Sequence, residues 1–139
     1  MTKTNINGKI YLALTNHLDT MTAGYAVAHQ GETFTPSVGS PYLIANDVRT
    51  DTPRAYIATD DPVKHTGFYM VDVMTPLNWT YPQMLGVVGR LVDRFSQDRS
   101  LTYDDVTVQV TDTPKPQGQA YRDGEFNRLP VKVMWAAWG

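Results

Sequence analysis

The chain contains 139 residues, 42% of them hydrophobic and 19% charged, and carries a formal net charge of −2. This length and composition predict a single globular domain, residues 1–139, with a core of its own, and the charge argues against nonspecific nucleic-acid binding. The absence of cysteine excludes disulfides, thiol nucleophiles and cysteine metal sites.

We expect neither a signal peptide nor a membrane span. Residues 1–5 lack an apolar signal core, and no apolar run reaches the length of about 18 residues that a transmembrane helix needs. We therefore expect no membrane partner. We expect a protein made and used in a cytoplasm-like setting, or inside a particle that is assembled there.

The first expected element is an amphipathic helix over residues 4–18. Its apolar residues recur every four positions, at Ile6, Ile10, Leu14 and Leu18, and so share one face. Five further segments follow: a short strand at 25–28, a turn-rich stretch at 29–40, a strand at 42–45, a polar loop at 46–52 and a strand candidate at 54–59.

Residues 65–74 form the longest early strand. Alternation turns one set of side chains to each side, and both sets are largely apolar: Tyr69, Val71 and Val73 on one face; Phe68, Met70, Asp72 and Met74 on the other. One face can pack on helices. The other needs a cover too, either another subunit or the chain's own N-terminal helix or a loop.

Residues 80–97 predict the second helix. Met84, Val87, Val88, Leu91, Val92 and Phe95 fall on one face. Thr80 and Gln83 have the spacing of a capping box, and Pro82 stands in the first turn, where its missing N–H costs nothing. Gly86 and Gly89 are poor helix formers, so they either admit another backbone closely or are simply tolerated.

After this helix the sequence predicts strands separated by a long polar segment. In the strand-like residues 101–111, Val106, Val108 and Val110 alternate inward. Residues 112–128 look loop-like and are long for a passive connection. They are expected to be a contact arm with a hairpin tip at Asp123-Gly124, or to stay disordered until a partner binds. The closing strand alternates inward at Leu129, Val131, Val133, Trp135 and Ala137.

The order of these elements predicts an α+β fold. Strands flank two helices in an order close to α-β-β-β-α-β-β, and hairpin-like neighbours favour antiparallel pairing. We expect a two-layer sandwich, with a mostly antiparallel or mixed sheet and two helices on one face.

The chain offers no recognisable catalytic or metal site. His17, His29 and His65 lack metal-ligand spacing and are expected at the surface or in loops. Asp60-Asp61 and Asp104-Asp105 are adjacent pairs that are more typical of turns than of a catalytic dyad. No serine has a nucleophile-elbow context and no phosphate-binding glycine loop occurs. We therefore expect no enzyme activity, no metal and no cofactor.

Four passages that span nearly the whole chain carry a family resemblance. They are the N-terminal helix leading into residues 31–36 and 39–43, the strand 67–73, the helix end 90–95 with Leu101 after it, and the closing strand 130–135. In their order and spacing they resemble the tail terminator proteins of long-tailed bacteriophages, the minor tail proteins that cap the tail tube. One departure is Thr75-Pro76-Leu77-Asn78-Trp79, where the family often has a glycine-rich turn.

The resemblance implies a structural role in the virion. Such proteins assemble in the host cytoplasm into a homo-hexameric ring at the head-proximal end of the tail. The ring stops polymerisation of the tail tube protein and offers a surface to a head-completion or connector protein, while phage DNA passes through the lumen without sequence readout. The family has no catalytic residues to carry over.

Two sets of residues are candidates for these contacts. A ring needs a heterologous interface whose rotation closes, and we expect Phe68, Met70 and Met74 to contribute to it. We expect the arm, residues 112–128, to contact the tube or a neighbouring subunit. The arm's candidate contact residues are Lys115, Gln119, Tyr121 and Arg122.

Three alternatives stay open. A head–tail connector, or neck protein, would share ring assembly and a small α+β fold. A small enzyme would use an acidic pair such as Asp104-Asp105. A ligand-binding module would show an otherwise unexplained apolar cavity.

Overall fold

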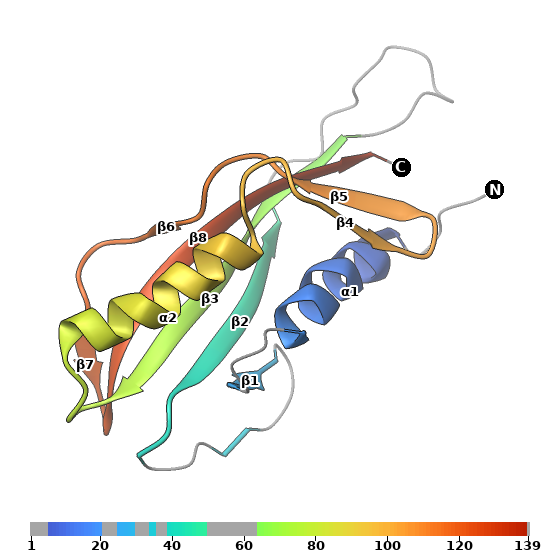
Figure 1. Ribbon diagram of the computed structural model, residues 1–139. Helices are drawn as coiled ribbons and strands as arrows, with labels where there is room; N and C mark the ends of the chain where they lie inside the picture. Colours follow the sequence, from blue (N-terminus) through green and yellow to red (C-terminus); the bar gives the residue numbers. More distant parts are fainter. Residues whose placement is uncertain (1–5, 21–24, 30–33, 36–38, 50–63, 139) are drawn as a thin grey trace.

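The computed structural model describes residues 6–20, 25–29, 34–35, 39–49 and 64–138 (Figure 1). Two helices and eight strands follow one another along these residues. They are α1 (Ile6–Asp19), β1 (Ala26–Ala28), β2 (Tyr42–Arg49), β3 (Lys64–Pro76), α2 (Tyr81–Arg94), β4 (Ser100–Tyr103), β5 (Val106–Val110), β6 (Lys115–Pro116), β7 (Tyr121–Asp123) and β8 (Phe126–Trp138).

The eight strands form one mixed sheet. Its main order is β1-β2-β3-β8-β5-β4, and β6 and β7 also pair with β8. The β1–β2 pair is parallel and all the other pairs are antiparallel. The long strand β8 is therefore central: β3 lies along one edge, and β5, β6 and β7 follow one another along the other. The predicted α+β class with a mixed sheet is confirmed.

Both helices pack against one face of this sheet. The alternation predicted for β3 places Tyr69, Val71 and Val73 in the core at 0% exposure, because neighbouring side chains of a strand point to opposite faces. The apolar stripes of α1 and α2 join the same core. The helix residues involved are Ile10, Ala13, Leu14 and Leu18 in α1, and Met84, Val87, Val88 and Leu91 in α2.

The start of α2 follows the predicted capping box. The backbone N–H of Gln83 donates to the Thr80 hydroxyl oxygen at 3.4 Å, and the backbone N–H of Thr80 donates to the Gln83 side-chain oxygen at 2.8 Å. Both bonds satisfy backbone groups that the first turn leaves without helical partners. Gly86 and Gly89 lie on the exposed side of the helix, where an added Cβ would meet nothing within 4 Å.

Two sequence expectations in the strands are wrong. Residues 46–49 were expected to be loop, but β2 continues through them because Asn46, Asp47, Val48 and Arg49 pair with β3. The strand-like residues 101–111 divide into β4 and β5, with a turn at Asp104-Asp105 and a positive φ of 56° at Asp104. The expected turn role of that acidic pair is confirmed. The strand candidate at 54–59 lies outside the described residues.

The arm, residues 112–128, was expected to be a contact arm with a hairpin tip or a disordered segment, and two stretches of it, β6 and β7, pair with β8. Val110 pairs with Trp135, and Lys115 pairs with Lys132. Between these two pairs the segment that leads from β5 to β6 advances by five residues, while β8 advances by three. The same step recurs before β7. Each interruption thus inserts two residues, an even number, so side chains keep their alternation between faces. The hairpin tip lies at Gly124-Glu125, where Gly124 takes a φ of 62°.

The C-terminal ends of the two helices are joined through His17. The Nε2–H group of its imidazole donates to the Arg94 carbonyl at 2.6 Å, and its ring meets the Phe95 ring edge-on at 5.1 Å. Arg94 in turn donates to the carbonyl of His17 and to the hydroxyl of Thr20. His17 was expected at the surface or in a loop, but it lies half-buried in this joint.

His17 makes the stability of the fold depend on pH. Burial lowers the pKa of His17 below its ordinary value of 6.5, the charges of Arg94 and Arg99 lower it further, and the bond to the Arg94 carbonyl opposes them. The unfolded chain therefore takes up this proton at higher pH than the folded one. We expect the free energy of unfolding to fall as pH drops below 6.5, and to level off below the folded pKa.

Urea denaturation at a series of pH values measures this effect. His17→Gln should flatten the decline, because glutamine keeps an N–H donor and does not titrate. His29→Gln is the matched control, since His29 pairs with Asp19 at 2.9 Å outside this joint. A slope unchanged by His17→Gln would contradict the assignment.

Candidate functional site

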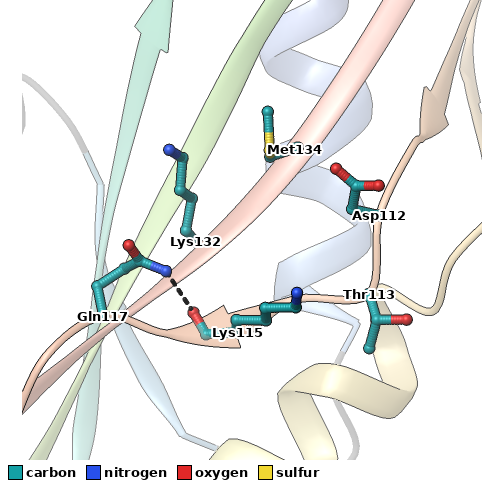
Figure 2. Close-up of a pocket in the computed structure, with 6 residues that line it drawn as sticks. All are labelled: Asp112, Thr113, Lys115, Gln117, Lys132 and Met134. Atoms are coloured by element: carbon teal, nitrogen blue, oxygen red, sulfur yellow. Dashed lines mark hydrogen bonds between the residues drawn. The ribbon is translucent and has the colours of Figure 1, made fainter.

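The face of the sheet opposite the helices carries the candidate site, and we call it the open face. The register assigns its side chains, because residues paired across neighbouring strands point to the same side. Figure 2 looks onto this face, with both helices behind the sheet. Its residues are Tyr42, Ile44, Asn46 and Val48 from β2, Phe68, Met70, Asp72 and Met74 from β3, and Arg128, Pro130, Lys132 and Met134 from β8.

An apolar row crosses the open face. Val48 pairs with Phe68, and Phe68 pairs with Met134, so three strands contribute adjacent side chains. Val48 is 37% and Met134 39% exposed, and Phe68 is half-buried. The Lys132 ammonium lies 4.3 Å from the centre of the Phe68 ring, a cation–π contact that places a positive charge beside the row. Exposed apolar side chains that lie together in this way are typical of a surface that another molecule covers.

The opposite end of the open face is closed by the chain itself. Tyr42, Met74 and Phe126 form a second buried cluster, against which Phe34 and Ile44 pack. The Tyr42 ring stacks on Phe34 at 5.1 Å and meets Phe126 edge-on at 5.0 Å. Met74 is only 2% exposed. Of the three residues predicted for self-assembly, Phe68 and Met70 are half-buried on the accessible part of this face, and Met74 lies beneath its own chain.

An ion-pair network separates this closed end from the apolar row. Asp72 is buried at 5% exposure and receives two hydrogen bonds from the Arg128 guanidinium, the one from Nε at 2.8 Å. Arg128 also reaches Asp123 of β7 at 2.9 Å. The network therefore joins β3, β8 and β7, and it neutralises the charge of Asp72, which would be costly to bury alone.

The arm borders the open face and forms a shallow pocket with it. Six residues line this pocket of about 170 Å³, and all of them except Met134 are polar or charged (Figure 2). Lys115 pairs in register with Lys132, and within the described part of the chain neither lysine has a carboxylate partner. The lining residues are Asp112, Thr113, Lys115, Gln117, Lys132 and Met134.

The four arm residues predicted for contacts are all exposed. Lys115 and Tyr121 face Lys132 and Arg128 in register and so lie on the open-face side. Arg122 donates to the Gly124 carbonyl at 3.1 Å, and Gln119 stands between β6 and β7. The exposure of these residues agrees with the prediction, and their contacts stay a prediction. The prediction missed Val48, which lay in an expected loop, and Met134, whose outward position the alternation of β8 already indicated.

The acidic pair proposed for catalysis has a structural partner. Lys9 of α1 lies 2.8 Å from Asp104 and 2.6 Å from Asp105, so the β4–β5 turn is tied to the helix. Hydrogen bonds to these two carboxylates raise the pKa of Lys9. In the part of the chain that the structure describes, no cluster of histidine and carboxylate side chains could hold a metal ion. The helices it describes are too short to cross a membrane.

Comparisons with known proteins bear on the family and on the fold. A family model described as "Phage tail terminator protein" matches residues 9–135, nearly the whole chain. A solved structure shares 20% identity and a TM-score of 0.73, and the match covers 99% of this chain and 96% of that one. At this identity it supports the fold alone. A search of curated proteins finds no match.

Proposed function

The chain belongs to the phage tail terminator family and is a structural protein of the phage tail, and from this premise we propose that it forms a ring at the head-proximal end. The proposed ring is a homo-hexamer that stops polymerisation of the tail tube protein and presents a joining surface to a head-completion or connector protein. DNA passes through its lumen without being read. Assembly takes place in the host cytoplasm.

The observation that carries this proposal is the uncovered apolar row of the open face. Val48, Phe68 and Met134 lie side by side on three strands, and none of the described helices covers them. Subunit association is the usual way to bury such a row. Met70 and Lys132 border this row, and Met74 is buried in the cluster at the closed end. A protein whose accessible apolar surface lies on a rigid sheet suits a fixed, repeated contact.

Tail length tests the proposal against the neck-protein alternative. A phage that lacks this gene should produce overlong tails, because nothing stops the tube from growing. Expression of the wild-type chain in trans should restore the normal length. The measurement is the distribution of tail lengths in negative-stain images. Tails of normal length that fail to join heads would instead assign the chain to the neck.

Outward side chains of the arm are expected to contact the tube or a neighbouring subunit. Because β6 and β7 are part of the sheet, deleting the arm would expose the edge of β8, so point substitutions make the sharper test. Lys115→Glu with Tyr121→Ser should leave stability within about 0.5 kcal/mol and weaken capping roughly fivefold, a loss of about 1 kcal/mol.

The fraction of overlong tails measures this loss. Thr102→Glu on β4 is the matched control, since Thr102 is exposed and lies outside the arm. Normal tail lengths in the double variant would remove the arm from the contact.

A further inference from the structure

The outward face of α2 combines two glycines with exposed apolar side chains, as a second contact surface would. Gly86 and Gly89 lie there, and a Cβ added at either position would have nothing within 4 Å, so the helix backbone is bare on this side. Tyr81 and Leu85 beside them are 55% and 38% exposed. Each glycine disfavours the helix relative to alanine, and a close-fitting neighbour would account for keeping both.

The charges of this face complement those beside the apolar row. Arg90 and Asp93 are exposed on α2, and in the described part of the chain neither forms an ion pair. The pocket beside Met134 offers the opposite set, with Lys115, Lys132 and Asp112, again without ion-pair partners among the described residues. A contact that places Asp93 against the lysines and Arg90 against Asp112 would give the charged side chains of both surfaces partners of opposite charge.

One molecule cannot bring these two surfaces together. The helix α2 packs on one side of the sheet, and the open face is the other side (Figures 1 and 2). They can meet only between two copies of the chain. Because the two surfaces differ, each copy would offer one to each neighbour, which is the heterologous arrangement that closes into a ring when the rotation fits.

We propose that the outward face of α2, at Leu85, Gly86, Gly89 and Asp93, docks on the open face of the next copy. The side chains of Phe68 and Met134 enter the gap over the two glycines, and Lys132 faces Asp93. This inference rests on the proposed ring and names the surface that completes each of its contacts.

Substitution of the glycines separates assembly from folding. Gly86→Gln and Gly89→Gln should raise the melting temperature of the monomer, because glutamine favours the helix and has open space around it. The same variants should lose ring formation in native mass spectrometry with the tail tube protein present. A higher melting temperature together with a loss of rings is the expected result. Rings that form as readily as those of the wild type would overturn the inference.

Cross-linking tests which surfaces meet. The chain has no cysteine, so Leu85→Cys with Met134→Cys introduces its only thiols. A short bis-maleimide should link this variant into a ladder that ends at the ring size. Either single variant should give no ladder, and Asn16→Cys with Met134→Cys, with one thiol on α1, is the matched control. A ladder in the control but not in the test pair would overturn the inference.

The outcomes distinguish this inference from the proposed function. Loss of rings in Met134→Lys, with rings intact in both glycine variants, would leave the ring standing and remove α2 from its contacts. A wild-type chain that stays monomeric with and without tube protein would overturn the proposed ring and this inference with it.

Discussion

Met134→Lys is expected to give a folded monomer that no longer assembles. Met134 is 39% exposed, so the lysine ammonium can stay in water in the monomer and the fold should hold. In the proposed ring the same ammonium would be buried beside Lys132. A like-charge contact of this kind costs several kcal/mol, and about 3 kcal/mol raises the dissociation constant of each contact roughly a hundredfold.

Native mass spectrometry and sedimentation at matched concentrations measure this loss. Asn16→Lys adds the same charge at an exposed position of α1 and should assemble like the wild type. Met70→Lys is a second test of the same face, with a larger effect on stability because Met70 is half-buried. In the phage, Met134→Lys should produce overlong tails. Rings that stay intact in Met134→Lys and in Met70→Lys would show that the open face is not an assembly surface.

The predicted elements that hold in the structure are those set by neighbouring residues. The cap of α2 depends on Thr80 and Gln83, three positions apart, and its apolar stripe repeats over the same helix. The inward positions of β3 and β8 follow from simple alternation. Such local patterns are present in the sequence itself, and for this reason the helices, the long strands and the α+β class could be predicted.

The elements that the sequence missed depend on distant partners. Residues 46–49 are polar, yet they form a strand because β3 pairs with them across the sheet. The arm reads as loop because Pro114, Pro116 and Gly118 interrupt it, but β8 supplies hydrogen bonds on both sides of each interruption, among them Gln117 N–H to the Pro130 carbonyl at 2.8 Å. Tertiary pairing overrides local preference here.

The candidate site shows the same division. Alternation correctly turned Phe68 and Met70 away from the helices, but alternation alone cannot tell which part of a face its own chain covers. Met74 follows the same pattern and is buried, because Phe34 and Tyr42 come from elsewhere in the chain to cover that end. Met134 and Val48 became neighbours of Phe68 only through the register of three strands.

Arg128→Met is expected to destabilise the fold by about 2–4 kcal/mol. The substitution leaves the carboxylate of Asp72, a residue that is 5% exposed, without its partner. Removing one member of a buried pair typically costs more than the pair itself contributes. The guanidinium is partly exposed, with 25% of the side chain accessible, which lowers the expected loss below that of a fully buried pair. The second contact, to the half-exposed Asp123, adds little.

Urea denaturation of the single and double variants separates these contributions. Asp72→Leu with Arg128→Met removes both charges, so no carboxylate is left unpaired, and most of the lost stability should return. Arg122→Met is the matched control, because among the described residues its guanidinium bonds only the exposed Gly124 carbonyl, and it should change stability by no more than about 0.5 kcal/mol. If the double variant is as unstable as Arg128→Met, the stability comes from packing of the arginine stem rather than from neutralising Asp72. Recovery would show that the network holds the closed end of the open face by compensating one buried charge.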